Sequence, residues 1–419
     1  MLQSKTIPSE IDIGITDYAM GLLLRYFRSP EIATINRPYI EIQRDREILR
    51  LHWAISPVLQ NLISYVVEHR HEIQSTLKTT VRYEDGIVRG KLDAVATLKL
   101  RRMSGLATAV VSHEPLRTHE SGPNHVLGWV IAQAWSLSSH FKQVELNSLS
   151  YRARIDEILG GIERVKRIQS VAQISSQINI ARRPTSRALL EATRSRREIY
   201  RRAALAYKEL VGVEAGDIDT ISNILRHTLL APLEPWRRFE LATAYAVADA
   251  LSQEEHSALQ LGTFIGSVKH PVAKAGRFAI YWQWRTDAYV KPIPEQSEIV
   301  MERLQDVWGL PSSSDRPDLI VLDQKKNQVV AIIEVKYLTG EDASDRIRGA
   351  FSQVVRYARG YRAIEDVGEL LGKCLIAVSQ GLEAITPPNP LPSDVPSVVD
   401  FEGIRHTSLQ EWTRRLVSA

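Results

Sequence analysis

The sequence PDLIVLDQKKNQVVAIIEVK, at positions 317–336, decides the fold of the C-terminal part of this chain. It contains two apolar runs, 319–322 and 329–333, which are separated by a polar segment. Two short runs rich in β-branched residues that are joined by a polar turn predict an antiparallel hairpin. We therefore expect a sheet at this point, with the polar residues at the ends of the hairpin held at its edge.

Three charged residues lie at the ends of these runs: Asp318 before the first, and Glu334 and Lys336 after the second. Alternate side chains of a strand share a face, so Glu334 and Lys336 are expected to point the same way, with Asp318 brought beside them by the hairpin. Carboxylates are the ligands that a hard divalent cation prefers, and such a cation activates water for phosphodiester hydrolysis. The lysine can orient that water or stabilise the charge on the phosphate. The pattern predicts a metal site with a cation beside it.

The segment 345–359 changes to a helical pattern. Gln353 and Tyr357 are four residues apart, so they are expected to lie on one stripe of this helix.

These spaced residues resemble the PD-(D/E)XK nuclease superfamily, in its RecB-like branch with a Gln-x-x-x-Tyr helix. The resemblance implies that Asp318 and Glu334 bind Mg²⁺ or Mn²⁺ and that Lys336 is catalytic. It implies accessory roles at the active site for Gln353 and Tyr357.

The same resemblance implies further metal ligands. One is the backbone carbonyl of Val335, and another is an acidic residue from the first helix of the nuclease core. Glu240 fits that position best, and Glu302 is the alternative.

Three segments are expected along the chain: an N-terminal α+β domain at 1–143, a basic helical segment at 144–231 and a nuclease domain at 232–419. The last is predicted to be α/β, a restriction-endonuclease-like central mixed sheet flanked by helices. The region before it is predicted to be mainly helical with a small β-sheet, whose strands are expected at 79–83, 90–100 and 107–111.

Composition agrees with a soluble globular protein, at 44% hydrophobic residues in a chain of 419. The single cysteine, Cys374, excludes a disulfide within the chain and fits a reducing compartment. The first residues do not have the pattern of a signal peptide, and no apolar run is long enough to span a membrane. We expect a cytoplasmic protein that does not enter a membrane.

Positive charge is concentrated in one part of the chain. The net charge is +4 and the isoelectric point is about 9.0. Residues 151–210 contain 14 Lys and Arg against 6 Asp and Glu. Seven-residue spacing of Arg187, Arg194 and Arg201, with Arg197 nearby, predicts a basic stripe on a helix that binds the DNA backbone. Contact with a partner protein and a solvated helical face are the alternatives.

A second resemblance covers about residues 80–140. The run from Gly90 to Asp93, then Glu114, and the helix start at Pro123-Asn124-His125 are loosely similar to McrC-type subunits of modification-dependent restriction systems. The match departs from that pattern because a glutamate is missing from the helix start and His125 stands in place of arginine. The similarity implies a separate AAA+ NTPase motor as partner, and this sequence has no Gly-Lys-Ser/Thr phosphate loop of its own. Apart from this resemblance, Asp93 is expected to have a structural role.

Two functions of different class follow. The first is a Mg²⁺-dependent DNA endonuclease, as the cleaving subunit of a restriction or anti-phage defence system. The second is a catalytically inert nuclease-like subunit that binds DNA or assembles a complex. The intact set Asp318, Glu334 and Lys336 favours the enzyme. An RNA nuclease is a third interpretation, and a homodimer is expected if both strands of a duplex are cut.

Overall fold

The computed structural model describes residues 9–28, 39–143, 149–262, 270–286, 289–290, 299–300, 303–304, 307, 316–338, 343–361, 367–380 and 391–418. The chain groups into two compact units. The first unit holds Met1–His52, Leu146–Leu149 and Gly216–Ala419, and the second holds Trp53–Glu145 and Ser150–Ala215. The predicted boundaries at 143/144 and 231/232 do not coincide with the limits of these two units, and the three predicted segments stay a prediction.

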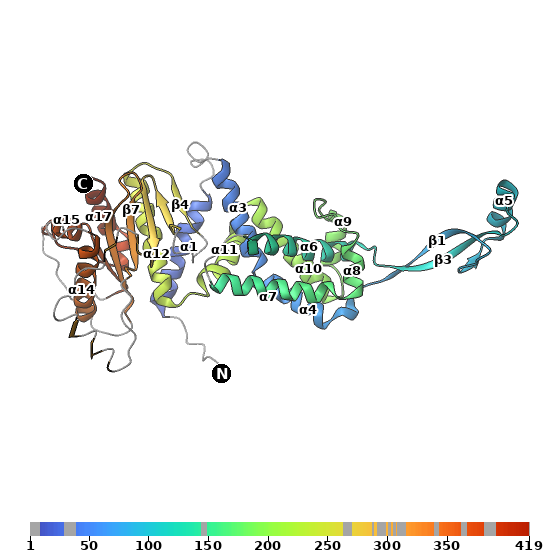
Figure 1. Cartoon of the computed structure of the whole chain (residues 1–419), viewed down its shortest axis with the longest axis horizontal. Helices are drawn as coiled ribbons and strands as arrows, with labels where there is room; N and C mark the ends of the chain where they lie inside the picture. The colour runs from blue at the N-terminus through green and yellow to red at the C-terminus, as the bar shows by residue number, and fades with distance from the viewer. Residues whose placement is uncertain are drawn as a thin grey trace. The chain divides into compact units, whose positions relative to one another are not determined.

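The first unit is built, in the part of the chain that is described, on a sheet of seven strands in the order β10-β9-β8-β7-β6-β5-β4 (Figure 1). Pairs from β4 to β8 are antiparallel, whereas β8, β9 and β10 are parallel to one another. This confirms the predicted central mixed sheet. The strands are β4 (Leu259–Leu261), β5 (Ala273–Ala275), β6 (Phe278–Trp282), β7 (Leu319–Asp323), β8 (Gln328–Lys336), β9 (Leu375–Val378) and β10 (Ser397–Asp400).

The predicted hairpin is confirmed as β7 and β8, and its turn has a local cause. Asp323 ends β7, and its Oδ1 accepts hydrogen bonds from the backbone N–H groups of Lys325 and Lys326, at 2.8 and 3.0 Å. Asn327 follows with φ of 49°, a left-handed conformation that asparagine tolerates. Side chains at 323 and 327 therefore close the turn and set the pairing of Leu319 with Ile333.

Helices cover both faces of this sheet. Ile320, Ile332 and Ile376 are fully buried against α14. Side chains alternate across a strand, so Trp282 faces the other side from Tyr281, and its indole reaches α12 there. The helical elements of the unit are α1 (Glu10–Arg28), α3 (Tyr39–Ala54), α11 (Ile218–Leu225), η2 (Arg226–Leu230), α12 (Pro235–Glu254), α14 (Ala343–Tyr361), α15 (Val367–Gly372), α16 (Phe401–Arg405) and α17 (Thr407–Ser418).

The second unit is mainly helical, as predicted for the region before the nuclease domain. Its core is built where α10 packs on α4, α6 and α9. Its helices are α4 (Pro57–Glu68), η1 (Arg70–Glu72), α5 (Ala94–Ser104), α6 (Gly122–Gln143), α7 (Leu149–Lys166), α8 (Gln169–Ser175), α9 (Ser186–Thr193) and α10 (Glu198–Ala215). None of the described helices in either unit is both long and apolar enough to cross a membrane.

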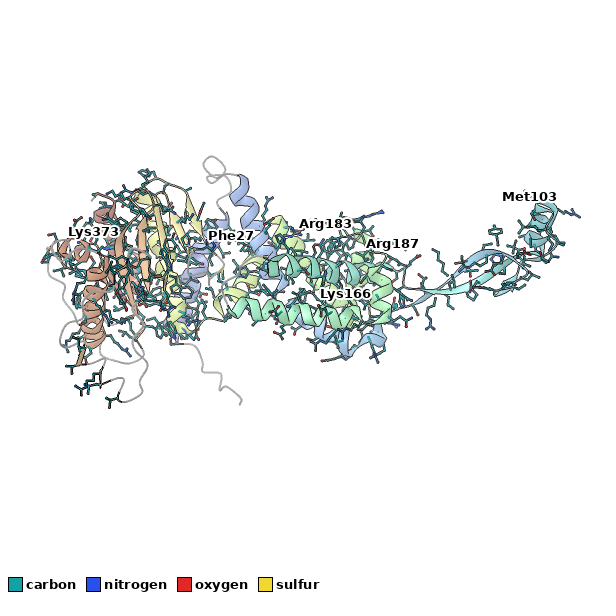
Figure 2. The ribbon with its side chains drawn as sticks, in the orientation of Figure 1. Phe27, Met103, Lys166, Arg183, Arg187 and Lys373 are labelled. Atoms are coloured by element: carbon teal, nitrogen blue, oxygen red, sulfur yellow. The ribbon has the colours of Figure 1, made fainter. Side chains whose placement is uncertain are left out.

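The small β-sheet of the second unit contains β1 (Thr76–Asp85), β2 (Lys91–Leu92) and β3 (Ala109–Thr118) in the order β1-β3-β2. Strands β1 and β3 pair over their whole length, from Thr76 opposite Thr118 to Asp85 opposite Ala109. We call residues 76–118, which include α5, the arm. Its apolar side chains are unusually exposed, at 61% or more for Leu77, Tyr83, Val95, Leu98 and Met103. Figure 2 labels Met103, which lies on α5.

One predicted strand of this sheet is wrong. Residues 90–100 form the two-residue strand β2 and then the first part of α5. Asp93 is the cause, because its Oδ1 accepts from the backbone N–H of Ala96 at 2.9 Å and begins the helix. Gly105, with φ of 73°, ends it. The structural role expected for Asp93 is confirmed.

Candidate active site

The structure brings Asp318, Glu334 and Lys336 together at the end of the β7–β8 hairpin. The backbone N–H of Val335 donates to Asp318 Oδ2 at 2.8 Å, and Lys336 Nζ donates to Glu334 Oε1 at 2.5 Å. Because Leu319 pairs with Ile333, Asp318 lies across from Glu334. The side chain of Glu334 is only 2% exposed, and that of Lys336 is 18% exposed.

Glu240 joins this group from α12. Its Oε2 accepts from the indole Nε1 of Trp282 and from Gln283 Nε2, the latter at 3.0 Å. The backbone N–H of Gln283 also donates to the carbonyl of Asp318 at 2.8 Å. Gln283 holds a positive φ of 48°, a conformation that is uncommon for a residue other than glycine and is often found at functional sites. The predicted alternative, Glu302, lies outside the described residues.

The electrostatics of this acidic group are unfavourable without a counter-ion. Burial raises the pKa of Glu240 to about 8, and the charge of Asp318 adds to the shift. Burial also raises the pKa of Glu334 to about 8, with Asp318 adding and Lys336 opposing. The pKa of Asp318 is raised by burial as well, against the pull of Lys336. Lys336 and Arg237 do not compensate three buried carboxyl groups, because the pKa values of all three stay raised, so the site favours protons or an added cation.

The donor set fits Mg²⁺ or Mn²⁺. Glu334 Oε2 is buried and has no hydrogen-bond partner among the described atoms. Among the described residues, no group of three or more His, Cys, Asp or Glu is close enough together to hold a metal ion. Mg²⁺ does not need three such residues, because it retains waters and is commonly held by one or two carboxylates together with phosphate oxygens of the substrate.

The two predicted accessory residues lie on α14, which packs on β8 and β9. Tyr357 is 3% exposed and belongs to the core cluster that contains Ile347 and Val354. Gln353 is half-buried on the same helix. The placement of Tyr357 supports a packing role, and an action of either residue on substrate stays a prediction, as does a metal bond from the carbonyl of Val335.

Sequence reasoning missed a second set of residues around the acidic group. Arg237 and Arg238 precede Glu240 on α12, and Tyr337 follows Lys336. The hydroxyl of Tyr337 donates to Asp12 Oδ1 at 2.6 Å, which fastens α1 to the end of β8. The side chain of Asp12 is remote in sequence from β8, and no spacing rule connects the two. The adjacent pair Arg237-Arg238, two residues before an expected ligand, was the one visible signal.

The predicted basic stripe is not on one helix. The chain leaves α9 at Arg194, which is its C-cap, and begins α10 only at Glu198. Arg187 pairs with Glu191 at 2.9 Å, Arg201 pairs with Glu198, and Arg197 donates to the carbonyl of Glu72.

The seven-residue spacing predicts one continuous helix, but residues 195–197 interrupt it. Figure 2 labels Arg183 and Arg187, which come before this interruption. DNA binding by Arg187, Arg194, Arg197 and Arg201 stays a prediction.

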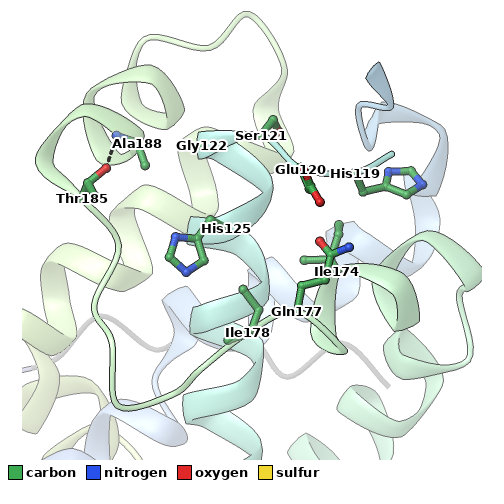
Figure 3. A pocket seen from close by; sticks show the side chains of 10 residues that line it. All are labelled: His119, Glu120, Ser121, Gly122, His125, Ile174, Gln177, Ile178, Thr185 and Ala188. Carbon is green, nitrogen blue, oxygen red and sulfur yellow. Dashed lines mark hydrogen bonds between the residues drawn. The ribbon is translucent and has the colours of Figure 1, made fainter. Parts of the chain in front are cut away.

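A hollow of about 450 Å³ lies in the second unit (Figure 3). Its lining comes from the start of α6, the segment at the end of α8 and the start of α9. Of its described lining residues, Glu120 alone carries a carboxylate, and its Oε2 pairs with Lys78 Nζ at 2.9 Å. Burial and the charge of Arg182 lower the pKa of His125 in this hollow. Its chemistry is not that of the acidic group on the seven-stranded sheet.

Comparisons with known proteins add little to this geometry. No protein-family model matches the chain, and no curated protein matches it. Among solved structures, the chain is similar to a refined half-complex from the tetradecameric assembly of Thermococcus gammatolerans McrB AAA+ hexamers with bound McrC, at 14% identity and a TM-score of 0.25. The match covers 97% of this chain and 75% of that chain. A TM-score this low carries no argument about fold or function, so the residues of this chain have to carry the assignment themselves.

Proposed function

We propose that this protein is a metal-dependent deoxyribonuclease of the PD-(D/E)XK type that hydrolyses phosphodiester bonds within DNA. The observation that carries the proposal is the buried convergence of Asp318, Glu334 and Glu240 beside Lys336, with Glu334 Oε2 lacking a partner among the described atoms. Burying carboxyl groups that repel one another lowers stability, and such unfavourable groups are typical of sites that bind a ligand.

Asp318 and Glu334 are the residues that would hold Mg²⁺ or Mn²⁺, and Glu240 lies near enough for the charge of Asp318 to raise its pKa. A bound divalent cation supplies polarisation of the phosphate and a lowered pKa for an attacking water. The hydrogen bonds from Trp282 and Gln283 fix the carboxylate of Glu240, which keeps the donor set in one geometry.

Lys336 is the group that acts on the reacting atoms. Its ammonium, held by Glu334 at 2.5 Å, is placed to donate to a phosphoryl oxygen as negative charge develops there. In the overall reaction a water oxygen bonds to phosphorus while one phosphorus–oxygen ester bond breaks. The leaving oxygen takes up a proton, and the products are a phosphomonoester and an alcohol.

A place in a restriction or anti-phage defence system, next to a separate AAA+ NTPase, completes the proposal. The sequence resemblance around Asp93 and His125 supports that setting, together with the lack of a phosphate loop in this sequence. The exposed apolar side chains of the arm are suited to contact with a protein partner, because exposed patches of this kind mark interaction sites. A homodimer is the other assembly to test.

A catalytically inert, nuclease-like subunit is the second candidate. The buried acidic group would then be a structural relic, and DNA binding or assembly would be the function. The intact Lys336–Glu334 pair favours the enzyme over this candidate.

The deciding experiment is cleavage of methylated and unmethylated plasmid DNA with Mg²⁺ or Mn²⁺, comparing the parent protein with Lys336→Ala. We expect metal-dependent cutting that falls about a hundredfold to ten-thousandfold in the variant. Equal, metal-dependent cutting by both proteins would show that the site is wrongly placed. If neither protein cuts, the assay is repeated with the candidate NTPase, and a second failure would favour the inert subunit.

A further inference from the structure

Two arginines at the start of α12 have donors that the described structure leaves without an acceptor. The Nε atoms of Arg237 and Arg238 are both buried, and neither makes a hydrogen bond among the described atoms. Arg237 Nε lies 3.5 Å from Glu234 Oε2, but the geometry is not that of a hydrogen bond. Buried donors are nearly always paired in folded proteins, so two orphans on adjacent residues require an explanation.

Both cations lie within electrostatic reach of the acidic group. The charge of Arg237 lowers the pKa of Glu240, opposing the effect of burial there. Burial raises the pKa of Tyr337, the residue that follows Lys336, and the charge of Arg238 opposes that shift. Arg237 also precedes Glu240 by three positions on α12, so the start of this helix lies near the candidate active site.

Neighbouring contacts fix where the two guanidinium groups can go. Arg238 Nη1 donates to Thr16 Oγ1 at 3.1 Å, and that hydroxyl donates to the carbonyl of Asp12 at 2.7 Å. The guanidinium of Arg237 lies 4.8 Å from the ring of Trp236. Each side chain is thus restrained at one point, an arrangement that lowers the entropy lost when a ligand binds.

We propose that Arg237 and Arg238 form a phosphate clamp, binding the non-bridging oxygens of phosphodiester groups that flank the scissile bond. This inference rests on the proposed function. The planar guanidinium fork of arginine matches a phosphate group in shape and charge. Both side chains are only partly buried, so their terminal Nη groups are the part that a phosphate can reach, and its negative charge offsets the charge of each guanidinium.

A structural role is the competing explanation, in which the arginines only offset the charge of the buried carboxyl groups. The two explanations differ in the salt dependence of DNA binding. Each lost phosphate contact reduces the steepness of the plot of log affinity against log salt concentration by about one. A purely structural pair changes stability and leaves that slope alone.

The test is fluorescence anisotropy with a labelled DNA duplex, in Ca²⁺ and over a series of salt concentrations. All proteins carry Lys336→Ala, so binding is measured without cutting. We expect the double variant Arg237→Gln/Arg238→Gln to bind about a hundredfold more weakly and to lose about two from the slope. Arg414→Gln removes a charge from α17, where Arg414 lies 3.5 Å from Glu254, and is the matched control that should bind as the parent does.

The double variant Arg237→Lys/Arg238→Lys keeps the charge, and we expect it to recover the slope but only part of the affinity. Melting curves show whether each variant is folded. If the double glutamine variant does not fold, the double lysine variant is used to test the proposal. Affinity and slope equal to those of Arg414→Gln would overturn the clamp, as would a parent protein that binds no DNA. The outcome is separate from the cleavage assay, because the binding series needs no catalysis.

Discussion

The two sheets of this protein depart from ordinary folding chemistry in opposite directions. The seven-stranded sheet is covered on both faces, yet it buries Glu240 and Glu334 at 4% and 2% exposure. The arm exposes Leu98 at 61% and Met103 at 88%. A buried charge and an exposed apolar patch are the two informative exceptions to the usual partition of residues. Each is unfavourable for the free chain, and on the proposed function each would be offset by a ligand: a cation and phosphate at one sheet, an apolar protein surface at the other.

The largest expected effect comes from removing a buried charge. Glu334→Gln keeps the shape of the side chain but weakens its bond to a cation, and we expect DNA cleavage to fall about a thousandfold or more. Because a neutral amide is cheaper to bury than a carboxylate, the free energy of unfolding in the absence of metal should rise at pH 8 and above. Plasmid cleavage and urea unfolding measure the two effects.

The control for this variant is Arg414→Gln, which should change neither quantity. If the Glu334→Gln protein cuts as fast as the parent, Glu334 is not part of the active site.

The contrast between the two regions can be tested by shortening one apolar side chain in each and comparing the free energies of unfolding. Ile332 is fully buried on β8, so Ile332→Ala should lower the free energy of unfolding by about 2–5 kcal/mol. Leu98 lies on α5 of the arm, and Leu98→Ala should change it by no more than about 0.5 kcal/mol. Urea unfolding of both variants is the measurement, and a cost of several kcal/mol at Leu98 would mean that the arm packs against something in the free protein.

The charge state of the acidic group makes stability depend on pH. The folded protein keeps protons on Glu240 and Glu334 up to about pH 8, whereas the unfolded chain loses them near pH 4.5. In the absence of metal, the free energy of unfolding should therefore fall as pH rises from about 4.5 to about 8, by on the order of a few kcal/mol. Mg²⁺ should raise the melting temperature more at pH 9 than at pH 6, since at the lower pH it has to displace protons.

Thermal melts with and without Mg²⁺ at the two pH values test this expectation. Glu240→Gln provides the control, because it should make the decline with pH shallower. Equal gains from Mg²⁺ at pH 6 and pH 9 would contradict it.

The smallest effect is expected on α14. Gln353 is half-buried beside the sheet, and we expect Gln353→Ala to slow cleavage about tenfold, because it removes an orienting amide but no metal ligand. Val355→Ala, at a side chain 38% exposed on the same helix, is the matched control and should cut normally. If Gln353→Ala cuts at the parent rate, Gln353 has a packing role only.

Local patterns in the sequence predicted one half of the acidic site. Asp318, Glu334 and Lys336 lie on one hairpin, where strand periodicity and a short turn fix their proximity. Glu240 could be proposed only through a family resemblance, because its approach depends on how α12 packs on the sheet. The bond between Tyr337 and Asp12 crosses more than three hundred positions, and no local rule predicts such a pair.

Two local predictions were wrong for a common reason. A capping residue outweighed β-rich composition at Asp93, which begins a helix where a strand was predicted. At Arg194 the helix ends, although the seven-residue arginine spacing predicted that it continues to Arg201. In both cases the side chains fit either structure, and hydrogen bonds at one or two positions decided between them.

The pairing of Thr76 with Thr118 has a consequence for how this protein can change over time. The arm leaves and re-enters the helical unit at neighbouring positions, so the chain between them can be shortened, lengthened or exchanged without moving α4 or α6. Substitutions in the arm also leave Asp318, Glu334 and Lys336 untouched, because those residues belong to the other compact unit. On the proposed function, partner choice could therefore evolve, or be engineered by grafting another hairpin, while the residues proposed for cleavage stay the same.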